Sequence, residues 1–506
     1  MNCIKKSCAL LLALFLSLVL LPLPAARADA PKPGDMTARC ILTAAQNGAS
    51  LKNLSDRDYE TAWKAGKDNM IRVRCEGKAD GVYILWNKAP EGWEIADGAD
   101  GSILARGGGM EFLHEYRAFA RESADFTFRL PDGAAVCELY VLEAGEAPGW
   151  VQRWNPPLDK ADLLVVSTHA DDEHLWYGGL MPVYAGQFHK KVQVAYFIRH
   201  GARRTHELLD GLWTVGVTAY PMLSPFPDRY VGSLEAALEA YDEEAGVAYQ
   251  TMLLRRFKPE VVVDQDIRGE YGHGAHRLNV RTLRKALKIS GNPDSCPESA
   301  ERYGAWEVKK CYLHLYAENQ IVMDWDQPLS EFGGKTGMEM AREGYACHVS
   351  QVKIGHYRVQ DKGKYDNRLF GLYYSSVGPD ERRNDLFEHV APCIPWEGRS
   401  RDELDRTVST AGPDELGGAV IFTAASADPG VSEPDGSSAP PESAPEPTSA
   451  PPAERGSADA SSRPVAADGG SSGSKTGSNA LWISGALVLA FLLLASILLM
   501  RARRRG

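Results

Sequence analysis

The stretch DLLVVSTHADDEH, residues 162–174, joins a short apolar run to a cluster of imidazole and carboxylate side chains. The β-branched part, 162–167, predicts a buried strand, so the polar cluster at 168–174 begins where that strand ends. A second cluster, GEYGHGAH at 269–276, follows another apolar run, EVVVD at 260–264. In an open α/β sheet, ligands bind beyond the carboxyl ends of the strands. We therefore expect the two clusters to meet at one site.

Each cluster alone also has an ordinary structural explanation. Acidic residues after a strand often begin a helix, where carboxylates accept hydrogen bonds from free backbone N–H groups. Paired histidines in a glycine-rich segment are often only a polar turn. Two such clusters, each placed after a predicted strand, favour a metal site instead. Imidazole and carboxylate ligands with one open position are typical of a mononuclear zinc hydrolase.

The region around these clusters, residues 158–396, alternates apolar runs with helical patterns. Two further strands are predicted at residues 191–198 and 309–316. Three helices are predicted at residues 203–215, 233–257 and 277–289. This alternation predicts an α/β domain with a Rossmann-like, mostly parallel sheet that helices cover on both faces. No G-x-G-x-x-G motif follows the first strand, so we expect no nucleotide cofactor.

The preceding region, residues 38–146, has a different pattern. Short alternating runs, bounded by Gly, Asp and Pro, predict an all-β sandwich. These runs are found at residues 71–76, 81–86, 126–130 and 137–142. The aromatic residues Trp63, Trp86, Trp93 and Tyr116 either pack the core or form a sugar-stacking platform. The segments LSDRDYETAW and GVYILWNKAPEGWEI resemble the galactose-binding-like discoidin jelly roll, which implies a possible carbohydrate-binding module.

The two ends of the chain predict export and anchoring. Lys5 and Lys6, an apolar run and small residues near position 30 are typical of a secretory signal peptide. Residues 481–500 are uncharged and about long enough to span a bilayer, and an arginine-rich tail follows. The positive-inside rule places that tail in the cytoplasm. We expect a single-pass cell-membrane protein whose N-terminal part is extracellular.

The expected order of segments follows from these patterns. A Pro-, Ser- and Gly-rich stretch from about residue 424 predicts a disordered stalk before the membrane span. The segments are a signal peptide at 1–30, a β-sandwich at 31–150, an α/β domain at 155–400, a linker at 401–479, a transmembrane helix at 481–500 and a cytoplasmic tail at 501–506.

Charge and cysteine content limit the partners and the covalent links. The net charge of −11 argues against a nucleic-acid partner. Seven cysteines follow the signal peptide, and outside the cytoplasm some should pair. Cys296 and Cys311 are the pair closest in sequence. The odd number leaves at least one cysteine free.

Three motifs in the α/β region resemble those of one enzyme family. They are HADDE at 169–173, RTHE at 204–207 with VGV at 215–217, and GHGAH at 272–276. In order and separation they are similar to the PIG-L/LmbE family of zinc-dependent N-acetylglucosaminyl de-N-acetylases. The resemblance covers the second domain and implies one Zn²⁺ bound by His169, Asp172 and His276.

The same resemblance implies roles for the remaining residues. Asp171 would be the general base, and His273 would stabilise the oxyanion together with the metal. Tyr271, Arg204 and Glu173 would lie on the substrate side, although Glu173 and Glu207 could instead pair with Arg204. A structural ion pair is the favoured interpretation for Glu207. His174 is an alternative fourth ligand, but its position in the run favours an orientation toward the following helix. We expect His200, His206, His314 and His348 to have packing or surface roles.

Two residues depart from the family pattern. Ala170 stands where the family has proline, which should loosen the loop without removing a ligand. Ala275 stands where the family has an aspartate that would orient His273. Without that carboxylate, the pKa of His273 should fall, unless Asp264 or Asp266 takes its place.

The resemblance and the expected topology lead to one hypothesis and two alternatives. The leading hypothesis is hydrolysis of N-acetyl groups on N-acetylglucosamine-type sugars of extracellular or cell-wall glycans. One alternative is a surface glycan-binding protein that keeps the fold without turnover. The other is a metal hydrolase that acts on other amides or on O-acetyl esters.

Overall fold

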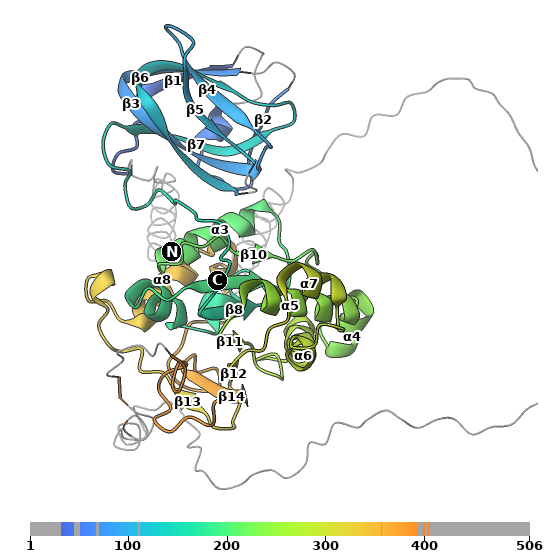
Figure 1. The fold of residues 1–506 in the computed structure, drawn as a ribbon. Helices are drawn as coiled ribbons and strands as arrows, with labels where there is room; N and C mark the ends of the chain where they lie inside the picture. Colours follow the sequence, from blue (N-terminus) through green and yellow to red (C-terminus); the bar gives the residue numbers. More distant parts are fainter. Residues whose placement is uncertain are drawn as a thin grey trace, which may run out of the picture. The chain divides into compact units, whose positions relative to one another are not determined.

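The computed structural model describes residues 32–44, 51–66, 70–109, 112–355, 357–391, 398–399 and 403 (Figure 1). The predicted signal peptide, stalk, membrane span and cytoplasmic tail lie outside these residues. Within the described part, no helix combines the length and the apolar character needed to cross a bilayer.

The N-terminal domain is an antiparallel β-structure, as its alternating sequence predicts. Its strands are β1 (Cys40–Ala44), β2 (Trp63–Lys64), β3 (Met70–Lys88), β4 (Trp93–Asp97), β5 (Ile103–Gly107), β6 (His114–Arg129) and β7 (Ala135–Glu143). The order is β2-β7-β3-β6-β4-β5, and β1 also pairs with β3. The two predicted runs at 71–76 and 81–86 lie within the single long strand β3. Register shifts between Arg74 and Gly81 let this strand change direction without ending.

The core of this domain is aromatic. Trp63, Trp86 and Trp93 are at most 5% exposed and pack in one apolar cluster. The indole N–H groups of Trp86 and Trp93 both donate to Oε2 of Glu115, at 3.0 and 2.8 Å. This satisfies their polar atoms inside the core. The core-packing interpretation of these three tryptophans is therefore confirmed, and none of them forms a sugar platform.

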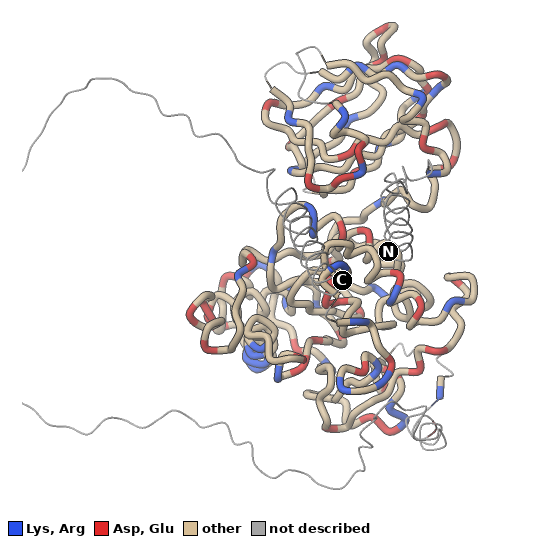
Figure 2. Tube along the Cα trace, turned by 180° about the vertical axis from the view of Figure 1, so that it is seen from behind, with Lys and Arg blue, Asp and Glu red and all other residues tan. Residues whose placement is uncertain are grey.

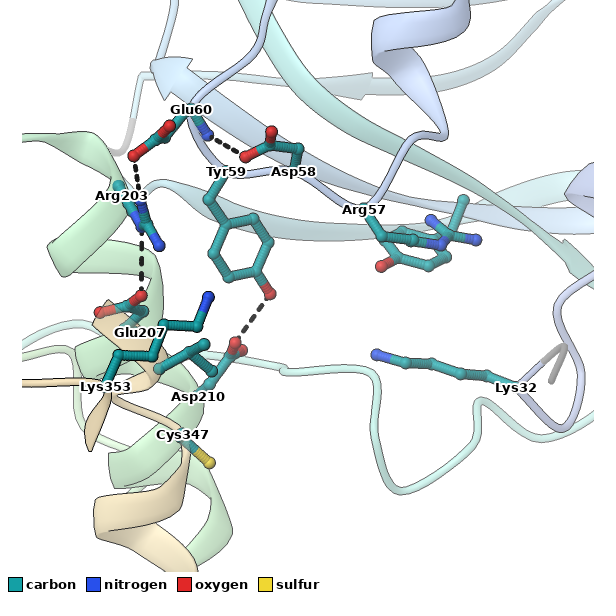
Figure 3. Close-up of a pocket in the computed structure, with 12 residues that line it drawn as sticks. Lys32, Arg57, Asp58, Tyr59, Glu60, Arg203, Glu207, Asp210, Cys347 and Lys353 are labelled. Carbon is teal, nitrogen blue, oxygen red and sulfur yellow. Dashed lines mark hydrogen bonds and ion pairs between the residues drawn. The ribbon is translucent and has the colours of Figure 1, made fainter. Parts of the chain in front are cut away.

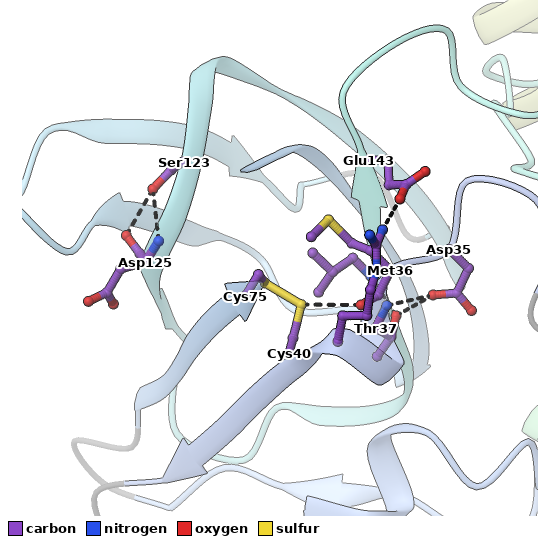
Figure 4. Close-up of a disulfide and its surroundings, with 10 residues drawn as sticks. Asp35, Met36, Thr37, Cys40, Cys75, Ser123, Asp125 and Glu143 are labelled. Carbon is purple, nitrogen blue, oxygen red and sulfur yellow. Dashed lines mark hydrogen bonds and ion pairs between the residues drawn. A yellow bond between two sulfur atoms is a disulfide. The ribbon is translucent and has the colours of Figure 1, made fainter. Parts of the chain in front are cut away.

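One disulfide links β1 to β3. Cys40 and Cys75 are partners in the antiparallel register and form this bond (Figure 4). Cys296 and Cys311, the pair closest in sequence, do not bond: both thiols are free, and Cys311 is buried in a strand. Cys137 and Cys347 are also free, and Cys393 lies outside the described residues.

The second domain contains a mostly parallel sheet. Its strands are β8 (Leu163–Ser167), β9 (Val192–Tyr196), β10 (Met222–Leu223), β11 (Val261–Asp264), β12 (Lys310–His314), β13 (Ile321–Val322) and β14 (Leu369–Ser375). The order is β10-β9-β8-β11-β12-β14-β13. The pairs from β10 to β12 are parallel, whereas β14 and β13 pair antiparallel at one edge. The four predicted strands of this domain are confirmed.

Helices cover both faces of this sheet, because alternate strand residues point to opposite sides. Leu163 and Val165 of β8 belong to one apolar cluster, and Leu164 and Val166 belong to the other. The helices are α2 (Asp172–Leu175), η3 (Pro182–Gln187), α3 (Ala202–Thr214), α4 (Leu234–Ala240), α5 (Glu243–Phe257), α6 (Gly274–Ile289), α7 (Pro297–Tyr303), α8 (Gly337–Ala346) and α9 (Val349–Val352). Figure 2 shows acidic and basic residues interspersed along the described chain.

Two predicted helices differ from the observed ones. The predicted helix 233–257 is two helices, because Tyr241 is extended and Asp242 caps α5 through Glu244 N and Ala245 N. The helix predicted from residue 277 begins earlier, at Gly274. As a result, His276 lies in the first turn of α6 rather than in a loop, and this turn fixes its position.

We expect the Cys40–Cys75 disulfide to contribute measurably to stability. Replacing both cysteines with serine opens a loop with a sequence separation of 35. Loop-closure entropy predicts a loss of about 3–4 kcal/mol in the free energy of unfolding. Urea unfolding under oxidising conditions measures this loss. Cys296→Ser, which alters a free thiol, should cost less than about 1 kcal/mol; an equal loss in both proteins would contradict the assignment.

Candidate metal centre

The candidate centre lies beyond the carboxyl ends of β8 and β11. These strands are parallel neighbours, with Leu163 opposite Val261 and Val165 opposite Val263. The chain leaves β8 toward α2 and leaves β11 toward α6. β9 pairs with the other edge of β8, so the connection after β8 and the connection after β11 lead to opposite sides of this point in the sheet. Ligands bind at such a point in doubly wound sheets. The two sequence clusters therefore converge as predicted.

Three potential ligand atoms form a nearly equilateral triangle. His169 Nδ1 lies 3.1 Å from Asp172 Oδ2 and 3.1 Å from His276 Nε2. The third side, from His276 Nε2 to Asp172 Oδ2, is 3.2 Å. All three side chains are nearly or fully buried. Two imidazole nitrogens and a carboxylate oxygen thus face a common point.

This donor set fits a single divalent cation. A tetrahedral zinc ion with bonds of about 2.0–2.2 Å separates its ligand atoms by about 3.3–3.6 Å. The three observed separations differ from that range by only a few tenths of an ångström, roughly the adjustment that rotamer relaxation allows. Burial lowers the pKa of His169 to about 3, so its imidazole is neutral and offers a lone pair.

Glu270 orients His276, a role that the sequence did not reveal. His276 Nδ1 lies 2.8 Å from Glu270 Oε2, and the carboxylate is fully buried. This hydrogen bond holds one ring proton on Nδ1 and leaves Nε2 as the atom that a metal would bind. Burial lowers the pKa of His276, but Asp172 and Glu270 raise it to about 10, so a metal that binds Nε2 displaces the second ring proton. The only signal for Glu270 was its position inside the second cluster.

Asp172 is held by two further donors. Its Oδ2 accepts the backbone N–H of His169 at 2.7 Å, and its Oδ1 accepts the Trp176 indole N–H at 2.7 Å. Burial opposes ionisation, yet His276 and His169 keep the pKa of Asp172 well below its usual value. The carboxylate is therefore anionic and its orientation is fixed from both sides.

Asp171 occupies a strained backbone position beside this triangle. Its φ of 128° is one that residues other than glycine rarely adopt. Its N–H donates to Glu173 Oε2 at 2.8 Å, and its Oδ1 accepts from Arg204 Nη2 at 2.9 Å. Burial and the charge of Asp172 raise the pKa of Asp171, although Arg204 opposes them. A carboxylate with a raised pKa suits a general base.

His273 is the fourth donor near the centre. A nitrogen of His273 lies within 4.8 Å of nitrogens of His169 and His276. Its Nδ1 is buried without a hydrogen-bond partner. Burial, and to a lesser extent the charge of His276, lowers the pKa of His273 to about 4. This lowering is the direction expected when the family aspartate is absent. Its imidazole is therefore neutral near pH 7.

The position of that missing aspartate is filled by an apolar contact. Ala275 is 0% exposed and packs in the cluster that contains Leu164. Asp264 instead accepts hydrogen bonds from Asn279 and from the backbone of Gln265. Asp266 accepts from the backbone N–H of Arg268. Neither aspartate therefore takes over the role predicted for it.

Aromatic side chains stand beside the centre. Tyr271 is 41% exposed and stacks on Tyr357, with ring centroids 4.5 Å apart and planes at 21°. The Tyr271 ring also lies 5.5 Å from the ring of His276. A partly exposed, stacked aromatic pair next to the ligand triangle is a suitable surface for one face of a sugar ring.

Glu173 does not lie where the resemblance implied. It is 0% exposed, and its carboxylate faces Asp171 N–H and His348. This burial contradicts the predicted contact between Glu173 and substrate. The alternative pairing of Arg204 with Glu173 or Glu207 is not observed, because Arg204 binds Asp171 instead. Glu207 forms an ion pair with Arg203 at 3.3 Å and accepts hydrogen bonds from Ser350.

The histidines outside the two motifs have different surroundings. His200 is beside the centre, with its ring 5.7 Å from that of His169 and its Nδ1 3.1 Å from Asp228 Oδ2. His314 lies 3.3 Å from Glu270. His206 Nδ1 contacts His114 Nε2 at 2.8 Å, a packing role. His200 and His314 are therefore neighbours of the centre that the sequence did not identify.

Comparison with known proteins identifies the relatives of this chain. A 1D-myo-inositol 2-acetamido-2-deoxy-alpha-D-glucopyranoside deacetylase from Geodermatophilus obscurus is 27% identical over 179 residues. That match covers 30% of this chain and 60% of the relative, so the chain spans less than two thirds of it. A deacetylase of the same name from Streptomyces avermitilis is 23% identical over 46% of this chain and 97% of the relative. The chain resembles the PIG-L/LmbE deacetylases. No family model matches it.

One solved structure gives a weak likeness. It is an N,N'-diacetylchitobiose deacetylase from Pyrococcus horikoshii, with 16% identity over 38% of this chain and 72% of that chain, and a TM-score of 0.31.

We expect Glu270→Gln to weaken metal binding. The substitution keeps the side-chain size but removes the charge that orients and polarises His276. Loss of such a partner typically costs about 10–100-fold in metal affinity. Competition with a chromophoric zinc chelator measures the change. Asp266→Asn is the matched control, because Asp266 caps a turn beside Glu270; equal affinities for both variants would contradict the role of Glu270.

Proposed function

We propose that this chain is a zinc-dependent deacetylase that removes the N-acetyl group from N-acetylglucosamine-type sugars. The observation that carries the proposal is the triangle of His169, Asp172 and His276, with the buried carboxylate of Asp171 next to it. The deacetylase relatives and the exposed Tyr271 beside the centre support it.

His169, Asp172 and His276 would hold the ion. When bound, a divalent zinc ion lowers the pKa of water and polarises a carbonyl group. The contacts of the neighbouring side chains suggest a role for each of them in the reaction. Asp171 precedes the ligand Asp172 in the chain, and Arg204 holds its carboxylate through Oδ1, so Oδ2 would accept the proton.

The reaction requires one proton acceptor and one donor. Asp171 takes a proton as the oxygen of water bonds to the acetyl carbon. The carbonyl oxygen gains negative charge, and neutral His273 donates a hydrogen bond to it. Asp171 then gives its proton to the sugar nitrogen as the C–N bond breaks. The products are acetate and a free amine.

The sugar would be held by aromatic stacking and by contacts at the mouth of the site. Tyr271 and Tyr357 offer a flat surface, and Tyr230 is 91% exposed with its ring 6.2 Å from that of His273. These side chains provide apolar contact area without charge, which suits a neutral N-acetylhexosamine.

A site outside the cytoplasm fits the rest of the chain. The Cys40–Cys75 disulfide is of a kind that persists in oxidising compartments. We propose that a signal peptide exports the chain and that residues 481–500 anchor it, so that the catalytic domain faces extracellular or cell-wall glycans. The β-sandwich would bring a second carbohydrate contact.

A non-catalytic role is the second candidate, because the Nδ1 atom of His273 has no partner that would orient its ring. In that case the chain would bind glycans without hydrolysing them. Acetate release by wild type separates the two candidates directly.

The proposed reaction predicts a specific effect of Asp171→Asn. The variant should still bind zinc, yet release acetate from N-acetylglucosamine oligosaccharides about 10²–10⁴-fold more slowly, because the amide cannot accept the proton. Acetate is measured by an enzyme-coupled assay with zinc-loaded protein, and O-acetylated sugars are tested in parallel.

Asp242→Asn is the matched control, since asparagine also caps a helix and Asp242 caps α5. It should keep the wild-type rate. Wild type that binds glycans but releases no acetate would refute the proposed catalysis and favour the second candidate. Faster release from O-acetyl substrates would change the substrate class.

A further inference from the structure

A second group of metal-binding side chains lies behind the candidate centre. Glu173 and His174 of α2 and His348, which precedes α9, place one donor atom each within 4.8 Å of one another. All three side chains are 0% exposed. The group shares no residue with the triangle of His169, Asp172 and His276.

Three ring nitrogens in this group have no hydrogen-bond partner. Glu173 Oε1 forms an ion pair with His348 Nε2 at 2.9 Å and lies 3.7 Å from His174 Nε2. Both ring nitrogens of His174 and Nδ1 of His348 are buried without a hydrogen-bond partner. Buried polar atoms are normally paired, so three such atoms together indicate a missing ligand.

The backbone around the group leaves no room for another side chain. A Cβ atom at Gly211 would lie 2.6 Å from His174 Nε2 and 3.1 Å from His348 Nε2. A Cβ atom at Gly344 would lie 2.5 Å from the His174 ring. Glycines from α3 and α8 therefore approach the two imidazoles closely, and neither can supply a polar side chain to them.

A cavity lies next to the chain neighbours of His348. The cavity has a volume of about 680 Å³, and Cys347 and Val349, the chain neighbours of His348, line it together with Glu207 (Figure 3). Tyr59 donates a hydrogen bond to Asp210 of α3 in the same cavity, at 2.7 Å. The cavity therefore borders the chain on both sides of the buried His348.

We propose that Glu173, His174 and His348 form a second, structural site for a divalent transition-metal ion, Zn²⁺ being the best match. Two imidazoles and one carboxylate are a common zinc ligand set, and complete burial suits a structural rather than a catalytic ion. The site joins α2 to the turn between α8 and α9, which are far apart in sequence.

This second ion would stiffen the candidate active site. The other oxygen of Glu173, Oε2, accepts the N–H of Asp171 at 2.8 Å. Asp171 needs that support because of its φ of 128°. A cation that fixes Glu173 therefore also fixes the backbone of the residue proposed as general base.

Zinc counting on the full chain tests the proposal. Wild type, loaded with ZnCl₂ and freed of excess ion, should hold two zinc ions per chain by inductively coupled plasma mass spectrometry. His169→Ala should hold one ion, at the second site. His348→Gln should also hold one, and the double variant none. The exposed His189, replaced by asparagine, is the control and should hold two.

The outcomes separate the two sites. One ion in wild type that is lost in His169→Ala would overturn the proposal and leave Glu173 and His348 as an ion pair or a water site. One ion that persists in His169→Ala and is lost in His348→Gln would support the second site while contradicting the proposed catalytic one.

A second readout does not depend on altering the cluster. In His169→Ala, added Zn²⁺ should raise the midpoint of thermal unfolding, because an ion that binds only the native state stabilises it. An unchanged midpoint would count against the second site even if His348→Gln failed to fold.

Discussion

The parallel pairing of β8 with β11 is the constraint on which the candidate centre depends. It aligns the carboxyl ends of two strands whose following segments hold His169 and His276, 107 positions apart in the chain. Alternate residues of β8 face different apolar cores, so a register shift of one residue would exchange the two faces. The apolar packing on both sides of the sheet therefore fixes the geometry of a polar site at its edge.

The centre concentrates charge in a buried volume. Asp171, Asp172, Glu173 and Glu270 are each at most 9% exposed, and an isolated buried carboxylate would be unstable. Each is satisfied in a different way: Asp171 by Arg204, Asp172 by two imidazoles and an indole, Glu173 by the Asp171 N–H and His348, and Glu270 by His276. A divalent cation would compensate the remaining negative charge.

Sequence patterns predicted the sheet and the meeting of the two clusters because both arise from local, repeating features. β-branched runs marked β8 and β11, and the polar residues after them marked the site. Features that depend on contacts distant in sequence were not predicted. The partner of Cys75 follows from the register of β1 with β3, and His348 joins His174 only through the packing of α8 on α2. The break before α5 was visible locally, because Asp242 is a favourable helix cap.

The most direct test of the central claim is an anomalous difference map from a zinc-soaked crystal, recorded at the zinc absorption edge. The account predicts a peak bonded to His169 Nδ1, Asp172 Oδ2 and His276 Nε2 at about 2.0–2.2 Å, with Asp171 beside it but not bonded. A map without density at that point, or a crystal in which these three atoms do not converge, would contradict it.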